Sequence, residues 1–240
     1  MPGHISPKEL KRDPFAEKLG HGVEVAASHA RATWSVIGVA AIVLVAFFGW
    51  RFWSGQQAQK AGAALDDAMK SFQARIRQPG EPEEPGEVTF VVEKIKYQEA
   101  RKKFDAVAHD YSLTPQGTMA RYYSALCSTH LEEVDKATAD LRSLADGSNA
   151  EVASLAKLSL ADISARTGKI DDAAKILSGL IDKPTSLVPK PRAQLALADL
   201  YRKSKPAEAA KLYQQVKKDY PDSPLADEAD RRLAEIGPVS

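Results

Sequence analysis

Two short clusters hold the residues whose types could support chemistry. In the first, His109 is followed directly by Asp110, and an imidazole beside a carboxylate is a common arrangement for acid–base catalysis. The two residues lie at the end of a helical pattern, and sequential neighbours on a helix face different ways. We therefore interpret this pair as the solvated end of a helix.

The second cluster is His130 with Glu132 and Glu133, whose side chains are ligand types for zinc. Such residues near a turn between helices are usually surface residues, so the sequence does not predict a metal site. The chain also lacks a phosphate-binding Gly-rich loop, an HExxH helix, a CxxC pair and a GxSxG motif. We expect a protein that is not an enzyme and that carries no metal or other cofactor.

Cys127 is the one cysteine of the chain, which excludes an internal disulfide framework. It lies among helical apolar residues, where burial is a more frequent role for a thiol than reactivity. The 33 basic and 32 acidic residues nearly balance, whereas nucleic-acid-binding domains usually show a clustered basic face. We therefore expect no nucleic-acid binding. Since the chain lacks catalytic motifs, we also expect no small-molecule substrate.

The first of the elements that position these residues is strongly apolar. No charged residue occurs between Trp34 and Trp50, and at about 1.5 Å per residue the run to Trp53 nearly crosses a bilayer. Tryptophan marks both of its ends, as is common where bilayer meets water. Arg51 can extend its guanidinium toward that interface. The pattern predicts a transmembrane helix over residues 34–53.

Two alternatives fit this run less well. A buried core helix is disfavoured because the run is uniformly apolar, and a cleaved signal peptide because no small-residue cleavage site follows. The basic residues nearby do not decide its orientation. Those before the run are Lys18 and Arg31, and those after it are Arg51, Lys60 and Lys70.

The rest of the chain divides around this helix. Residues 1–33 form a short polar tail that is too small to build a core. Residues 54–87 are expected to hold a helix over 56–78, in which Ala63 and Ala68 are spaced five apart, and an exposed, mobile loop rich in Pro, Gly and Glu. Residues 88–240 are long enough for one domain.

This last part repeats about every 36 residues, with apolar positions i, i+4 and i+7 that form one helical face. The three sets are Ala100, Ala137, Ala173 and Ala209, then Phe104, Leu141, Leu177 and Tyr213, then Val107, Leu144, Leu180 and Val216. Alternating segments carry alanines spaced five apart, which would let helices approach closely. These pairs are Ala120 and Ala125, Ala156 and Ala161, Ala193 and Ala198, Ala229 and Ala234.

Local chemistry marks several helix ends. Thr114 before Pro115 predicts an N-cap and a first helical residue, and Gly168 predicts a helix C-terminus. Ser223-Pro224 opens a last helix that has no following partner. The fold class is therefore all-α, with an apolar N-terminal helix, an α-solenoid of about four helix pairs and a C-terminal capping helix.

The repeat resembles the tetratricopeptide family, especially in residues 209–213 (AAKLY) and 220–224 (YPDSP). The second segment resembles the inter-repeat turn of periplasmic members that act in envelope assembly. The layout of the chain further resembles the YfgM family of ancillary SecYEG translocon subunits, with residues 49–53 (GWRFW) at the exit of the span. The Pro/Glu-rich insertion at 79–87 and the final repeat depart from that family.

The YfgM resemblance implies a bacterial inner-membrane protein with a cytoplasmic N-terminal tail and periplasmic repeats. It also implies contacts with the translocon, with a membrane-anchored periplasmic chaperone or with exported polypeptides. In tetratricopeptide domains, helices of the type that here carries Tyr122 and Tyr123 line the concave surface. This pair is therefore the expected partner contact. Packing of one or both rings in the core is an alternative. Weaker candidates on the same repeat face are Arg121, Lys157 and Gln194.

The sequence therefore predicts a membrane-anchored adaptor or chaperone-like factor associated with the translocon. The alternative is a structural scaffold for envelope assembly or cell division that binds one folded partner.

Overall fold

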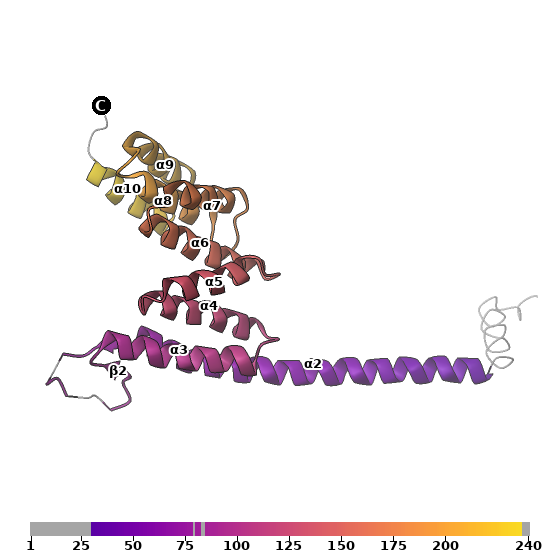
Figure 1. The fold of residues 1–240 in the computed structure, drawn as a ribbon. Coiled ribbons are helices and arrows are strands. Elements are labelled where there is room, and N and C mark those ends of the chain that lie inside the picture. The colour runs from indigo at the N-terminus through magenta and orange to yellow at the C-terminus, as the bar shows by residue number, and fades with distance from the viewer. Residues whose placement is uncertain (1–29, 79, 83–84, 237–240) are drawn as a thin grey trace, which may run out of the picture. The chain divides into compact units, whose positions relative to one another are not determined.

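The computed structural model describes residues 30–78, 80–82 and 85–236, and this part of the chain folds into nine α-helices and one pair of short strands (Figure 1). The expected all-α fold is confirmed. The chain divides into two compact units, residues 1–56 and residues 57–240. The expected polar tail lies, up to residue 29, outside the described residues.

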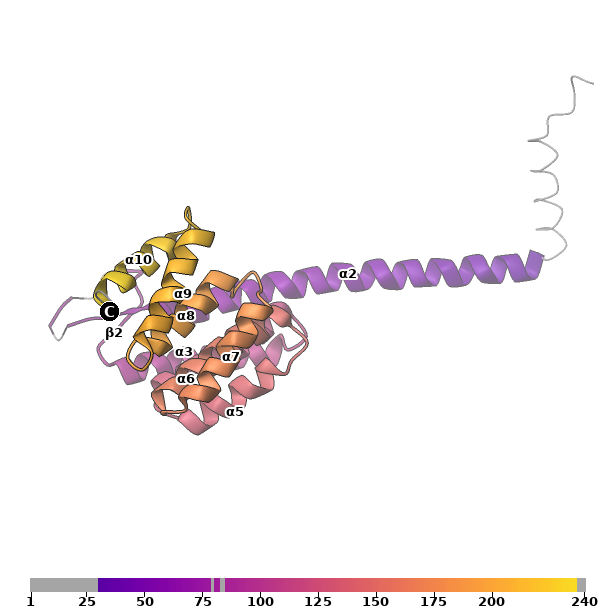
Figure 2. The same cartoon turned by 90° about the horizontal axis from the view of Figure 1, so that it is seen from above.

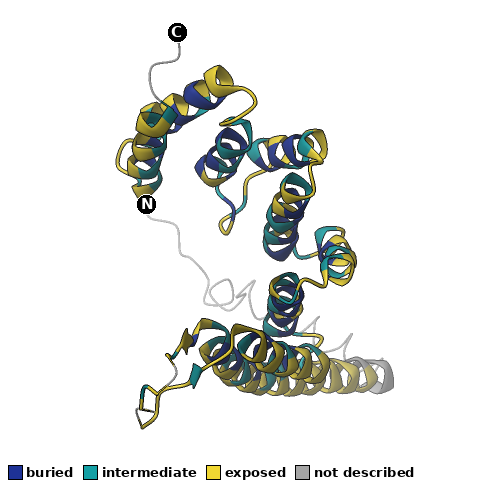
Figure 3. Cartoon of the chain, turned by 60° about the vertical axis from the view of Figure 1, so that its left-hand side comes forward, coloured by how far each residue is buried: buried dark blue, intermediate teal, exposed yellow. Residues whose placement is uncertain are grey.

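The first helix, α2 (Ala30–Gln73), is 44 residues long. No charged residue occurs in α2 between Trp34 and Trp50, and this run is exposed, with Trp34 at 73% and Trp50 at 64% of their accessible surface. Figure 3 shows this part in yellow. Within the described residues, one helix is long and apolar enough to cross a membrane. A core helix of a soluble domain would instead be largely covered by protein.

The expected helix after the apolar run is a direct continuation of α2, and it ends at Gln73, earlier than residue 78. Two short parallel strands follow, β1 (Arg75–Ile76) and β2 (Thr89–Phe90). The chain between them is largely exposed, as expected, but Pro79, Glu83 and Glu84 lie outside the described residues.

Ion pairs hold this connection, which the sequence pattern did not predict. The Arg75 guanidinium donates to Glu81 at 2.7 Å and to Glu87 at 2.9 Å. These two carboxylates raise the pKa of Arg75 above its ordinary value. Glu81 and Glu87, which belong to the acidic residues of this segment, therefore bind it to Arg75 of β1.

Eight further helices follow, and consecutive helices pack on one another (Figures 1 and 2). They are α3 (Glu93–Asp110), α4 (Pro115–His130), α5 (Val134–Ala145), α6 (Ala150–Arg166), α7 (Ile170–Asp182), α8 (Lys190–Tyr201), α9 (Pro206–Asp219) and α10 (Pro224–Ile236). The C-terminal part of α2 packs on α3 as the first pair. The solenoid therefore has four pairs and a final helix, as expected.

Helix ends follow the local chemistry. The Thr114 hydroxyl accepts a hydrogen bond from the Gly117 N–H at 3.0 Å, and Pro115 is the first helical residue. A Cβ at Gly117 would lie 2.1 Å from the Tyr111 carbonyl oxygen, so only glycine fits where α4 starts beside the end of α3. Gly168 has φ +79 at the end of α6, as its predicted C-terminal role requires.

All twelve positions of the i, i+4, i+7 repeat are buried, so the repeat register is confirmed. The alanine pairs follow a simple rule. In each interior pair, the first alanine lies in the cluster shared with the preceding helix pair, and the second lies in the following cluster. Thus Ala156 packs with α4 and α5, and Ala161 packs with α7 and α8.

The same rule accounts for the alanine pairs at the two ends of the solenoid, where one alanine of each pair has no neighbouring helix. Ala68 is buried, but Ala63 is exposed because no repeat precedes it, and Ala61 is buried on the helix instead. At the other end, Ala229 is buried against α9, whereas Ala234 is exposed because no described helix packs on that side of α10. An alanine five residues from its partner points about 140° away, toward a second neighbour.

This rule predicts different costs for the same substitution at equivalent positions. Ala198→Leu inserts a larger side chain between α8 and α9, so we expect it to lower the free energy of unfolding by about 1–3 kcal/mol. Ala234→Leu at the exposed equivalent should change it by less than about 0.5 kcal/mol. Urea unfolding of both variants measures the difference, and equal stabilities would contradict the rule.

Candidate protein-interaction surface

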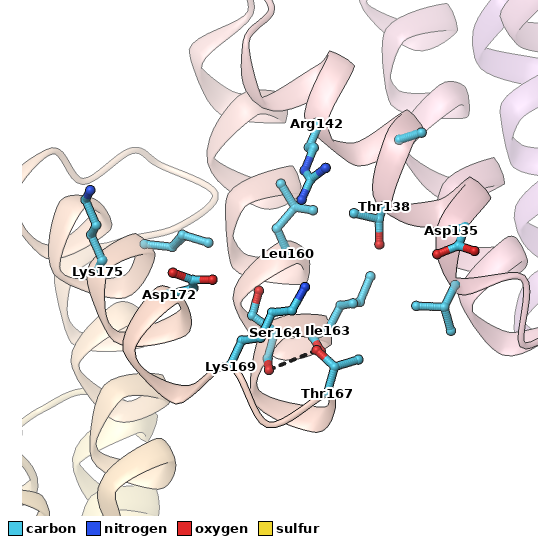
Figure 4. Close-up of a pocket in the computed structure, with 13 residues that line it drawn as sticks. Asp135, Thr138, Arg142, Leu160, Ile163, Ser164, Thr167, Lys169, Asp172 and Lys175 are labelled. Atoms are coloured by element: carbon cyan, nitrogen blue, oxygen red, sulfur yellow. Dashed lines mark hydrogen bonds between the residues drawn. The ribbon is translucent and has the colours of Figure 1, made fainter.

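A groove opens between α5 and α7, with α6 as its floor (Figure 4). We name it the α5–α7 groove, and its volume is ≈ 520 Å³. Leu160 and Ile163 of α6 form the apolar floor, and both are buried in the core below. Its volume lies in the range of ligand-binding clefts, and its lining combines an apolar base with polar walls.

The walls of the groove are charged. Asp135 and Arg142 come from α5, Lys169 is the residue just before α7, and Asp172 and Lys175 come from α7 itself. In Figure 4, Arg142 and Lys169 both point toward Leu160. Among the described residues, none of these five charged groups forms an ion pair or a side-chain hydrogen bond.

The equivalent gap one repeat earlier, between α3 and α5, is narrowed by side chains of the protein itself. Arg101 of α3 pairs with Glu133 at the start of α5 at 2.5 Å. On its floor, the Ser124 hydroxyl donates to Asp105 at 2.5 Å. The remaining cavity there is ≈ 160 Å³. Side chains of the chain thus narrow this gap, whereas they leave the α5–α7 groove open.

The two predicted tyrosines pack in the core. Tyr122 is 8% exposed, its hydroxyl lies 3.1 Å from the Ser159 hydroxyl, and burial raises its pKa. Tyr123 is half-buried and stacks on Phe104 with a centroid distance of 5.3 Å. This placement agrees with the packing alternative for both rings.

The weaker predicted candidates are not brought together. Gln194 is 2% exposed, and its Oε1 has no hydrogen-bond partner. Arg121 is exposed and lines the α3–α5 gap, where its guanidinium lies 3.4 Å from the Ser143 hydroxyl. Lys157 is exposed on α6. A partner-binding role for these residues stays a prediction.

Sequence reasoning missed the α5–α7 groove, although one signal was present. Asp135, Thr138 and Arg142 are spaced i, i+3 and i+7, which places them on one face of α5. The core positions of α5 are spaced i, i+4 and i+7 on another face of the helix, and they carry the stronger apolar pattern.

The histidines that the sequence offered for acid–base or metal chemistry, His109 and His130, contact other side chains of the protein. His109 and Asp110 form an exposed pair at 2.9 Å at the end of α3, as interpreted from the sequence. His130 stacks on Tyr97 with a centroid distance of 4.0 Å, and burial lowers its pKa. The described residues contain no group of three side chains that could hold a metal ion.

Cys127 is fully buried in α4, and burial raises its pKa to about 12. At pH 8 the folded protein should therefore hold a thiolate fraction on the order of a thousandfold below that of a free cysteine. We expect reaction with a thiol-specific disulfide reagent to be slow in the folded state and fast in urea.

The matched control for this measurement is Cys127→Ala/Ser204→Cys, which places the thiol in the exposed turn before α9. Its thiol should react at once without urea. Rapid labelling of Cys127 in the folded protein would contradict the described packing.

Two family models match the chain. A tetratricopeptide repeat-like domain matches residues 30–187, and a tetratricopeptide repeat matches residues 192–223. The first match includes the apolar part of α2, and the second covers α8 and α9 with the turn that follows. A search of curated proteins finds no significant match.

Proposed function

Because this chain belongs to the tetratricopeptide repeat-like domain family, we propose that it is a membrane-anchored adaptor that binds other proteins through its repeats. The observation that carries this proposal is the exposed apolar part of α2 on a chain that also folds a repeat domain. Apolar surface in water costs about 25 cal/mol per Å². A bilayer removes that cost, with Trp34 at one end of the span and Trp50, Arg51 and Trp53 at the other.

The proposed location is the inner membrane of a bacterium, with the repeats in the periplasm. The layout of the chain and the sequence GWRFW at residues 49–53 support this location through their resemblance to the YfgM family. The proposed partners are the translocon, a periplasmic chaperone or exported polypeptides. Anchoring raises the effective concentration of the repeats near such membrane partners, which strengthens weak contacts.

A second candidate is a structural scaffold in envelope assembly or cell division. It is favoured by the turn at residues 220–224 (YPDSP), in which the Ser223 N–H donates to the Tyr220 carbonyl at 3.0 Å. A pull-down with a scaffold of this kind would recover a single folded partner in stoichiometric amount. A pull-down with an adaptor for export would recover translocon subunits and chaperones.

Protease accessibility tests the location. In intact cells, the repeats should resist an added protease, and permeabilising the outer membrane alone should expose them to cleavage. Protection that persists until the inner membrane is broken would place the repeats in the cytosol and would contradict the export-associated function.

Crosslinking tests the partners. A photoreactive amino acid at Arg121 or at Lys157, the exposed members of the predicted set, should capture translocon subunits or a membrane-anchored chaperone in native membranes. The photoreactive amino acid in place of Trp50, inside the proposed span, is the control, because it should capture only neighbours within the membrane. Capture of neither class from either repeat position would argue against the adaptor function.

A further inference from the structure

We propose that the α5–α7 groove binds an extended segment of a partner polypeptide in which an aliphatic side chain lies beside carboxylates. This inference rests on the proposed adaptor function and names the chemistry of its ligand. It follows from comparing the groove with the equivalent gap between α3 and α5, position by position along the repeat.

The two gaps carry opposite charges at two equivalent positions. The repeat register that aligns Ala100, Ala137 and Ala173 also aligns Asp105 with Arg142, and Glu133 with Lys169. In the α3–α5 gap, therefore, the chain supplies two carboxylates. In the α5–α7 groove, the same two places hold cations.

The carboxylates of the first gap are used within the protein. Glu133 pairs with Arg101, and Asp105 accepts a hydrogen bond from Ser124. The cations of the groove have no such partner in the part of the chain that the structure describes. Carboxylates from another chain would complete in the groove what Asp105 and Glu133 complete one repeat earlier.

The position of Lys169 strengthens the preference for an anion. Lys169 is the N-cap residue of α7, and it makes no side-chain capping hydrogen bond. The N-terminal end of a helix carries partial positive charge, so a cation there is unfavourable and an added carboxylate is favourable. Asp171 and Asp172 offset part of this charge from within the first turn of α7. The groove lining as a whole still carries three cations, Arg142, Lys169 and Lys175, against the two carboxylates of Asp135 and Asp172.

The floor of the groove adds an apolar requirement. Leu160 occupies the position that Ser124 holds in the first gap, so the hydroxyl that donates to Asp105 is replaced by an isobutyl group. An apolar floor beneath two unpaired cations fits an aliphatic side chain with acidic neighbours. In Figure 4, the side chains of Arg142 and Lys169 lie on opposite sides of Leu160.

Fluorescence anisotropy with the full chain in detergent tests this inference. Three labelled peptides of equal length present a central leucine flanked by glutamate, by glutamine or by lysine. We expect the glutamate peptide to bind most tightly, and Arg142→Gln/Lys169→Gln to weaken it about tenfold through loss of charge-assisted hydrogen bonds. The control Lys211→Gln/Lys218→Gln removes two exposed cations from α9 and should leave binding unchanged.

A second variant separates specificity from loss of folding. Arg142→Glu/Lys169→Glu should reverse the preference, so that the lysine peptide binds more tightly than the glutamate peptide. Equal binding of all three peptides to the unmodified chain, tighter binding of the lysine peptide to it, or no binding at all would overturn the inference. Partner crosslinks from Arg121 or Lys157 that persist in such a case would leave the adaptor function standing.

Discussion

Each interior helix that carries an alanine pair lies between two neighbours, and this constraint determines most of the repeat domain. A helix in such a place needs two close-packed faces, and a side chain larger than a methyl group would push one neighbour away. Alanines spaced five apart, such as Ala156 and Ala161, supply one small contact on each side. Larger side chains fill the core between these contacts, and those at the repeat positions of α5 and α9, such as Leu141 and Tyr213, are fully buried.

The packing of α6 between its neighbours also creates the α5–α7 groove. Because α6 packs against both α5 and α7, these two helices lie on either side of it and leave a gap above its outer residues. What fills that gap depends on residues outside the packed faces, which the repeat does not constrain. The same backbone arrangement therefore gives a small cavity beside Asp105 and a larger groove with unpaired cations beside Arg142.

The sequence predicted the helices, the repeat register and the buried positions because each depends on local spacing. Thr114, Gly168 and the apolar triplets carry their information within a few residues of themselves. The groove depends instead on whether charges on separate helices meet a partner, and the ion pairs of Arg75 depend on the path of a loop. The tyrosine pair shows the limit most clearly, because composition alone cannot distinguish an exposed ring from one stacked on Phe104.

The alternation of the alanine contacts has a consequence for how the domain forms. Contacts among the described helices link neighbours or next neighbours along the chain. Loop closure therefore costs little at each step, and a pair of helices gains most of its contacts once the next helix is present. Such a chain acquires structure progressively from its first repeat as it emerges, with no need to wait for its C-terminus.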